Sequence, residues 1–445
     1  MATTRRSEAA EAAGPQNVDA GSDATGMPSA VSDAPLEGLR VVDFTHLVAG
    51  PFCTMMLADA GATVVKIEPP WGDSSRLRGA RRDGPDGRHV SGYVVATNRG
   101  KKAIVLDLKT DRGREVALRL IERADVVTEN FAPGVLDRIG LGLEHLRRLN
   151  PRLITVSISL LGSQGSTMPE RAGLAIVAEA ESGLASRVLD ETGRPVPFGF
   201  PLGDIASGLT AYGGILTALL ARGVNGVGRH IDVSMVRTLF AFNATAVAGY
   251  ALAGESERAI TTAPYGYFDS ADGHVAIAVN VDNLWVKFCG AIGRPELAVD
   301  PRYSHYSQRD PRVAEVGKIV TAWTQTRSSK EIVDVLATAG VPCGRINTIG
   351  EIVDDPAYRE AGLFTSVMDG MGGMVDIPRN LLGYVRPSAR IPQMGEHTVE
   401  VLRDLGCSDR EIEDLLAGGA LGDDAGQVRA QLRPLRGDGG TPAGA

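Results

Sequence analysis

Short apolar runs alternate with amphipathic stretches over the first half of the chain. The apolar runs predict strands, and the stretches in which apolar residues recur every three or four positions predict helices. We expect strands at 39–44, 62–68, 103–108, 125–129 and 153–158, and helices at 51–60, 110–123, 133–139 and 143–149. Strands and helices that alternate at this spacing are typical of a mostly parallel sheet covered on both faces. The pattern therefore predicts an α/β fold with a large, Rossmann-like parallel-sheet domain.

The pattern changes in the second half and predicts a smaller α+β domain. Residues 265–270 and 274–279 form a hairpin in this interpretation, because Asp272-Gly273 between two apolar runs is a turn signal. We expect three further helices at 283–292, 312–325 and 329–339. Between the two domains, residues 231–252 are apolar and long enough for one connecting helix.

These elements divide the chain into six segments. We expect a disordered tail (1–33), a large α/β domain (34–222), a connector helix (223–254), a small domain (255–340), a return segment to the large domain (341–417) and a frayed tail (418–445). The first tail has few large apolar groups and cannot bury a core, and the last is rich in Gly, Asp and Arg.

Composition excludes several classes of function. The 445 residues include 46 Lys and Arg against 54 Asp and Glu, a net charge of −8 that gives no support to nucleic-acid binding. No apolar run reaches the roughly 18 residues that a membrane helix needs, and residues 1–30 lack the apolar core of a signal peptide. We therefore expect a cytoplasmic protein without a membrane partner. The four cysteines show no metal or redox spacing, so no metal site is expected.

The stretch 196–222 changes character at Asp204. Prolines and glycines hold the residues before it out of regular structure, and the residues after it have helical spacing. An Asp at such a junction can simply cap the helix, and its ionised form is favoured by the helix dipole. However, the helix is rich in small residues, among them Gly208, Gly213 and Gly214. Because glycine costs a helix roughly 1 kcal/mol relative to alanine, these glycines indicate close packing or a nearby ligand.

A parallel sheet also suggests a dinucleotide-binding enzyme. Glu68 ends the second predicted strand, where an acidic residue would meet a ribose. However, the turn after Phe44 reads Thr-His-Leu-Val-Ala-Gly-Pro and lacks the G-x-G-x-x-G fingerprint. A nicotinamide or flavin enzyme is therefore disfavoured, and Glu68 is interpreted as a solvated strand end.

Several strings, taken in order, resemble one known family. They lie at 36–44, 49–51, 65–68, 100–102, 129–131, 136–138, 203–204 and 340–342. Together they resemble the class III CoA-transferases, which include formyl-CoA:oxalate, carnitine and succinyl-CoA:dicarboxylate transferases and are related to acyl-CoA racemases. The resemblance spans about residues 35–417. Each string alone is weak, and their order and spacing make the match specific.

The resemblance implies that Asp204 is a nucleophile rather than a cap. Its carboxylate would attack the acyl-CoA thioester to form a mixed anhydride, and the CoA thiolate would then convert Asp204 into an enzyme–CoA thioester. An acceptor carboxylate would take the CoA through a second anhydride. This chemistry needs no permanently bound cofactor, because CoA is a substrate. Backbone N–H groups near Asp204 should stabilise the oxyanions, and Gly213-Gly214 is compatible with that role.

The resemblance also implies a CoA site and a quaternary structure. The residues that match the family's CoA-binding positions are His46, Leu47, Ala49, Lys101, Asn130, Phe131, Arg138 and Ile139. Lys101 and Arg138 suit phosphates, and Phe131 suits the adenine or pantetheine surface. The partners implied are an acyl-CoA donor, a carboxylate acceptor and a second copy of the chain in an interlocked homodimer.

This sequence departs from the family pattern at three places. Pro69 stands where some relatives have arginine, and Leu174-Ala175 stands where many have Tyr-Asp or Tyr-Glu, with Glu179 and Glu181 nearby. No glycine-rich lid is evident around 279–284, which disfavours oxalate as acceptor. The positions around Gly203-Asp204 resemble the branch that uses succinyl-CoA and dicarboxylates more closely, and the choice of acceptor stays open.

Two alternative functions stay open on the sequence. An acyl-CoA racemase or epimerase of this family would pair the Asp with a His in the preceding segment, but 151–203 contains no histidine. A non-catalytic CoA-binding paralogue is the other alternative, and the Leu174-Ala175 departure supports it.

Overall fold

The structure is a computed structural model, and it describes residues 34–84, 88–162, 173–254, 262–384, 389–422 and 427–432. The predicted tail over 1–33 lies outside these residues, as do the last residues of the predicted frayed tail.

Within the described ranges, six parallel strands form the central sheet, in the order β5-β2-β1-β6-β7-β8. The strands are β1 (Arg40–Asp43), β2 (Thr63–Glu68), β5 (Lys102–Val105), β6 (Val126–Glu129), β7 (Ile154–Ser159) and β8 (His230–Ser234). Val41 on β1 lies between Val64 of β2 and Val126 of β6. The strands read as continuous apolar runs because helices cover both faces of the sheet. The predicted α/β fold is confirmed.

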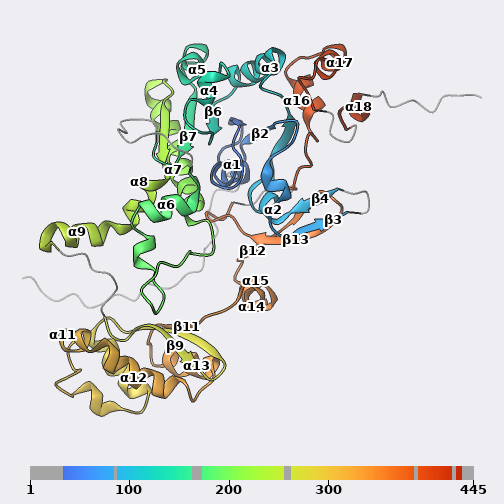
Figure 1. Cartoon of the computed structure of the whole chain (residues 1–445). Helices are drawn as coiled ribbons and strands as arrows, with labels where there is room; N and C mark the ends of the chain where they lie inside the picture. Colours follow the sequence, from blue (N-terminus) through green and yellow to red (C-terminus); the bar gives the residue numbers. More distant parts are fainter. Residues whose placement is uncertain are drawn as a thin grey trace, which may run out of the picture.

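Two layers of helices enclose the sheet (Figure 1). One layer contains α3 (Asp111–Glu122), α4 (Val135–Arg138), α5 (Leu143–Leu149), α16 (Thr398–Asp404), α17 (Asp409–Ala417) and α18 (Gln427–Leu432). The other contains α1 (Ala49–Asp59), α6 (Ala175–Glu181), α7 (Leu202–Asn225) and α8 (Met235–Phe240). Among the described helices, α7 is the one long and apolar enough, by length and composition alone, to span a bilayer. Its buried residues pack against α1 and the sheet, as in a core helix.

The prediction of a single helix at 231–252 is wrong. The segment begins with strand β8, continues through α8 and a 3-10 turn at Ala241–Asn243, and ends with α9 (Ala244–Ala253). Ser234 ends the strand and caps α8, because its side chain accepts a hydrogen bond from the Arg237 N–H. A short apolar run does not distinguish a strand from a helix, which explains the error.

A second hydrophobic core lies in a smaller lobe, shown at the bottom of Figure 1. Its antiparallel sheet has the order β11-β10-β9, and the predicted hairpin around Asp272-Gly273 is confirmed. The elements are β9 (Tyr265–Ser270), β10 (Gly273–Ala278), β11 (Cys343–Arg345), α10 (Asp282–Ala291), α11 (Tyr306–Arg309), α12 (Val313–Thr324) and α13 (Ser329–Thr338). Because β11 pairs with β10, this lobe extends past the predicted end at residue 340.

The chain then returns to the large body. It passes through α14 (Ile349–Asp354), α15 (Pro356–Glu360) and the hairpin β12 (Phe364–Met368) and β13 (Met374–Pro378). A second small hairpin, β3 (Arg81–Asp83) and β4 (His89–Ser91), precedes α2 (Gly92–Thr97). The frayed tail predicted from residue 418 is wrong for the residues described, because Ala420, Leu421 and Val428 are buried in the main core.

Candidate active site

Asp204 lies in the first turn of α7, as the third residue of the helix. The residue at the N-cap position is Pro201, and no side chain caps this helix. The interpretation of Asp204 as a cap is therefore wrong. Its position near the positive end of the helix dipole still favours a negative charge there.

The small residues of α7 allow close packing around Asp204. A Cβ on Gly208 would lie 2.6 Å from the backbone oxygen of Ala49, and one on Gly203 would lie 3.1 Å from the Cα of Ala175. The start of α7 is therefore packed tightly between α1 and α6. The expectation that Gly213-Gly214 supplies oxyanion donors is wrong. Both lie inside the helix, about 14 Å along its axis from Asp204, where their N–H groups belong to the helix ladder.

The Asp204 carboxyl is half-buried and lacks a compensating charge. Burial, followed by the charge of Glu179 on α6, raises the pKa of Asp204 to about 6. Glu179 itself is buried and accepts a hydrogen bond from the Gly203 N–H at 3.3 Å. Among the described residues, no lysine, arginine or histidine forms an ion pair with either carboxyl. A carboxyl whose pKa is raised in this way is typical of a functional site.

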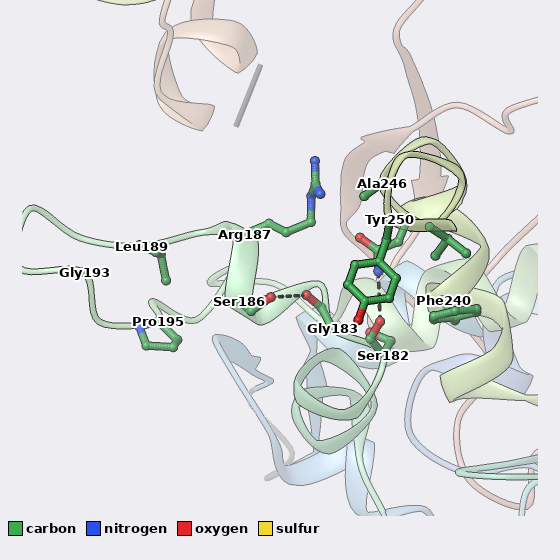
Figure 2. Close-up of a pocket in the computed structure, with 12 residues that line it drawn as sticks. Ser182, Gly183, Ser186, Arg187, Leu189, Gly193, Pro195, Phe240, Ala246 and Tyr250 are labelled. Carbon is green, nitrogen blue, oxygen red and sulfur yellow. Dashed lines mark hydrogen bonds between the residues drawn. The ribbon is translucent and has the colours of Figure 1, made fainter. Parts of the chain in front are cut away.

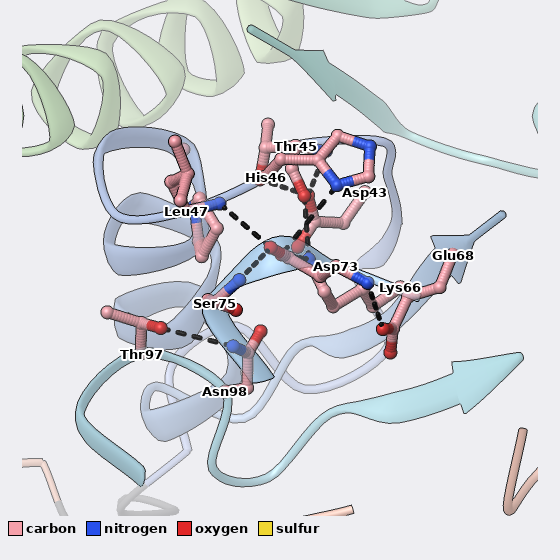
Figure 3. Close-up of polar contacts among 12 residues, drawn as sticks. Asp43, Thr45, His46, Leu47, Lys66, Glu68, Asp73, Ser75, Thr97 and Asn98 are labelled. Carbon is pink, nitrogen blue, oxygen red and sulfur yellow. Dashed lines mark hydrogen bonds and ion pairs between the residues drawn. The ribbon is translucent and has the colours of Figure 1, made fainter. Parts of the chain in front are cut away.

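A strained loop joins β1 to α1 next to this helix (Figure 3). Leu47 has a φ of 65°, a conformation that is uncommon outside glycine. The Asn130 side chain holds the loop, because its oxygen accepts from the His46 N–H at 2.8 Å and its amide donates to the His46 oxygen at 2.9 Å. The Leu47 N–H donates to Asp73 at 3.2 Å. Asn130 was predicted to bind CoA. In the structure it holds the backbone of the loop at 46–49, which contains other residues that were predicted to bind CoA.

A cavity of about 660 Å³ opens on one side of this loop. The predicted residues His46, Phe131 and Ile139 line it, and the rings of His46 and Phe131 are 5.7 Å apart. Its other walls are Phe44, Ile67, Pro69, Trp71, Gly72, Ser74, Leu77, Leu106, Asp107, Leu108, Lys109 and Val135. Arg138 is exposed at the end of the same short helix, α4, whose neighbours Val135 and Ile139 line the cavity.

Sequence reasoning missed two residues at the mouth of this cavity. The Lys109 ammonium lies over the Trp71 ring, 4.9 Å from its centroid, and both side chains are exposed. The only signal in the sequence was the position of Lys109 directly after a predicted strand, since strand ends line ligand sites in parallel sheets.

Lys101, predicted to contact a phosphate, is instead enclosed in the protein. Its Nζ pairs with Asp43 at 3.0 Å and donates to the Pro51 backbone oxygen at 2.9 Å and the Asn98 side chain at 3.0 Å. Burial lowers the pKa of Lys101 to about 8, against the attraction of Asp43. Lys101 does not line the cavity, so the phosphate role is not supported by its geometry.

Further buried charges lie around Lys66, and each has a partner. Lys66 pairs with Asp73 at 3.0 Å, and Arg76 pairs with Glu68 at 2.6 Å. Burial would raise the pKa of Asp73, but the charge of Lys66 outweighs this and holds that pKa well below its usual range. Glu68 is fully buried, so its interpretation as a solvated strand end is wrong. This network fixes the position of the loop from beneath.

A second cavity, of about 460 Å³, lies on the other side of the loop. Val48 reaches it from the loop, and Pro201 and Ile205, on either side of Asp204, reach it from α7. Leu47 and Ala49 line neither cavity. The remaining walls are mostly apolar: Phe52, Met55, Met56, Gly79, Ala80, Gly92, Tyr93, Ala96, Thr97, Arg99, Pro378, Arg379, Asn380 and Leu381. This lining contains no histidine. The loop at 46–49 therefore separates a cavity with a basic mouth from an apolar cavity beside Asp204.

Comparison with known proteins identifies the class. The sequence model of CoA-transferase family III matches residues 36–398, and the chain belongs to this family. It is accordingly a CoA-transferase that acts on CoA thioesters.

Individual relatives carry more specific names. Succinyl-CoA:mesaconate CoA-transferase of Haloarcula hispanica is 34% identical over 83% of this chain and 96% of its own length. Succinate–glutarate CoA-transferase of Agrobacterium fabrum is 34% identical over 87% of this chain and 99% of its own length. Formyl-CoA:oxalate CoA-transferase of Afipia carboxidovorans is 32% identical over 87% of this chain and 98% of its own length. The crystal structure of a CAIB/BAIF family protein from Brucella suis superposes with a TM-score of 0.74 at 32% identity, covering 84% of this chain and 99% of that one.

Proposed function

We propose that this chain moves CoA from an acyl-CoA thioester to a carboxylic acid through covalent intermediates on Asp204. The observation that carries the proposal is the Asp204 carboxyl, half-buried, without a cationic partner among the described residues and next in the chain to Ile205, which lines the apolar cavity. A carboxylate in such a site is poorly solvated, which makes it a better nucleophile towards a thioester carbonyl.

The two cavities supply places for the two parts of an acyl-CoA. The cavity lined by His46, Phe131 and Ile139 has apolar walls for adenine or pantetheine, and Lys109 and Arg138 at its edge provide positive charge for phosphates. The apolar cavity beside Pro201 and Ile205 provides space for the acyl group. The thioester would then lie at the loop between them, next to Asp204.

Succinyl-CoA as donor and a dicarboxylate as acceptor are the substrates we propose. Relatives named for succinyl-CoA or succinate reach 34% identity, and a succinyl-CoA–D-citramalate transferase of Chloroflexus aurantiacus reaches 33%. The reaction exchanges one thioester for another and is nearly isoenergetic, so it requires no ATP.

The test is a matrix of acyl-CoA donors against carboxylate acceptors, run with the parent enzyme and with Asp204→Asn. We expect turnover with succinyl-CoA and dicarboxylates, and a loss of at least about 10³-fold in the Asn variant, as when other covalent nucleophiles are removed. An Asp204→Asn enzyme that transfers CoA at the parental rate would refute the mechanism. Turnover confined to formyl-CoA and oxalate would refute the substrate assignment.

We also propose that two copies of the chain form a homodimer, in the cytoplasm. Helix α9 is apolar but has no buried residue, and it extends from the side of the large body (Figure 1). Phe240 and Tyr250 line an open cavity with Arg187 at its edge (Figure 2). A surface of this kind favours burial by a partner. The four cysteines are all free, which suits a reducing compartment.

Light scattering tests the dimer. We expect twice the chain mass for the parent and a shift towards the monomer for Tyr250→Asp, because burial of a charge in an apolar contact is costly. The matched control is Tyr267→Asp, an exposed tyrosine on β9 in the small lobe. A monomeric parent would contradict this part of the proposal.

A further inference from the structure

Glu179 is a buried acid without a visible counter-charge. It lies on α6 with 4% of its surface exposed, and no lysine, arginine or histidine of the described residues forms an ion pair with it. A buried charge is normally paired, because leaving it uncompensated costs several kcal/mol. Its hydrogen bond is from the Gly203 N–H, at 3.3 Å, and Gly203 directly precedes Asp204 in the chain.

The packing of α6 on α7 fixes this geometry. Gly203 lies against Ala175, the first residue of α6, where a Cβ would approach the Ala175 Cα to 3.1 Å. The other end of α6 is also held, because the Asn243 side chain donates to the Ser182 backbone oxygen at 2.9 Å. The backbone of α6 at Glu179 is therefore held against the start of α7.

We propose that Glu179 is a positioning residue that anchors the first turn of α7 and sets a like charge against Asp204, so that acylation of Asp204 relieves a repulsion present in the free enzyme. This inference rests on the proposed function of Asp204 and adds a reason for its reactivity. The raised pKa of Asp204, for which Glu179 is the second cause after burial, agrees with it.

The charge changes on Asp204 show how the repulsion enters the reaction. An Asp204 oxygen attacks the thioester carbonyl, the C–S bond breaks, and the electron pair leaves on the CoA sulfur. Asp204 is then an uncharged anhydride, and the negative charge has moved to the thiolate. The thiolate next attacks the Asp204 acyl carbon and expels the former acyl group as a carboxylate, which leaves Asp204 as an uncharged thioester. Glu179 thus disfavours only the free state of Asp204, and so favours both covalent states over it.

Other charged groups around α7 do not supply this effect. On α1, Asp59 is held by Arg99 at 2.6 Å, and on α8, Arg237 is exposed. Strand β7 carries no charged residue. His230 and Asp232 belong to β8, which packs near Gly214, about 15 Å along the helix from Asp204. Glu181, on the same helix as Glu179, is exposed and serves as the matched control.

The experiment compares pH profiles of the full-length parent, Glu179→Gln and Glu181→Gln. The parent should lose kcat/KM below about pH 6, the pKa of Asp204. In Glu179→Gln we expect this acid limb to move down by roughly one pH unit, and kcat on the plateau to fall by about tenfold with an unchanged KM for acyl-CoA. Glu181→Gln should match the parent in the position of the acid limb, in kcat and in KM.

Four outcomes decide the matter. The expected shift in Glu179→Gln alone supports the proposal. A parental acid limb and plateau in that variant overturns it. Equal shifts in both variants also overturn it, because they report general charge rather than this contact. A Glu179→Gln chain that fails to fold overturns it too, since removal of a repulsion should leave the protein at least as stable above pH 6. In each of these last three cases, loss of transfer in Asp204→Asn still supports the proposed function.

Discussion

Two groups of buried acids in this molecule are built differently: one surrounds Asp43, and the other consists of Asp204 and Glu179. Around Asp43 each acid has a cation: Lys101 at 3.0 Å from Asp43, and Lys66 at 3.0 Å from Asp73. Asp204 and Glu179 repel each other, and among the described residues neither carboxyl forms an ion pair with a cation. The first arrangement stabilises the ionised acids and fixes a backbone. The second destabilises the ionised form of Asp204, the residue that we propose as the nucleophile. Paired charges thus hold the loop in place, and the unpaired acids form the site of the proposed chemistry.

The largest expected effect on stability comes from breaking the balanced group. Lys101→Met leaves Asp43 buried without its closest cation, and we expect a loss of about 3–5 kcal/mol in the free energy of unfolding, measured in urea. Lys102→Met is the control, because Lys102 is partly exposed and pairs with Glu400 at the surface. For Lys102→Met we expect a loss of about 0–1 kcal/mol in the free energy of unfolding. Equal losses in the two variants would contradict a special role for the buried pair.

The unbalanced group should respond in the opposite direction. The pKa of Asp204 is raised in the folded protein from its ordinary 3.8 to about 6, so its ionisation costs stability above pH 6 and nothing below about 3.8. Asp204→Asn should therefore be more stable than the parent at pH 8, by about 1–3 kcal/mol. The difference should shrink as the pH falls from 6 to 4. Denaturant melts at pH 8 and pH 4 measure it, and a variant less stable than the parent at pH 8 would count against the account.

A smaller effect is expected at the mouth of the cavity lined by His46 and Phe131, where we propose that CoA binds. Lys109→Ala removes a cation that we propose contacts a phosphate, and we expect KM for acyl-CoA to rise about tenfold at low salt with kcat nearly unchanged. The rise should diminish in high salt, because the side chain is exposed and its charge is screened. Lys102→Ala, outside the cavity, controls for net charge. A fall in kcat without a change in KM would place Lys109 elsewhere in the reaction.

The sequence predicted five of the six strands of the sheet and the start of a helix near Asp204 because both depend on local pattern. The apolar strands stand between amphipathic helices, and the change from proline and glycine to helical spacing marks the junction at Asp204. Strand β8 was missed because its apolar residues run directly into α8 without a turn signal. The ordered residues Ala420 and Leu421 were missed because their neighbours are glycines and acids, although the two side chains themselves are buried.

The site was harder to predict than the fold because burial is a tertiary property. Lys101 precedes and Lys109 follows the strand predicted at 103–108, yet Lys101 is enclosed by Asp43 and Lys109 is at a cavity mouth. Glu179 stands in an unremarkable helix, and only the packing of α6 on α7 shows that its carboxyl reaches the residue before Asp204. Composition and spacing carry no information about such contacts.

The central claim is that Asp204 becomes covalently modified during turnover, and trapping measures this directly. The full-length enzyme is incubated with succinyl-CoA, treated with borohydride, digested and analysed by mass spectrometry. We expect reduction of the activated side chain to an alcohol at Asp204, dependent on the acyl-CoA and absent from Asp204→Asn. A peptide containing Asp204 that remains unmodified in an enzyme that turns over under the same conditions would contradict the account.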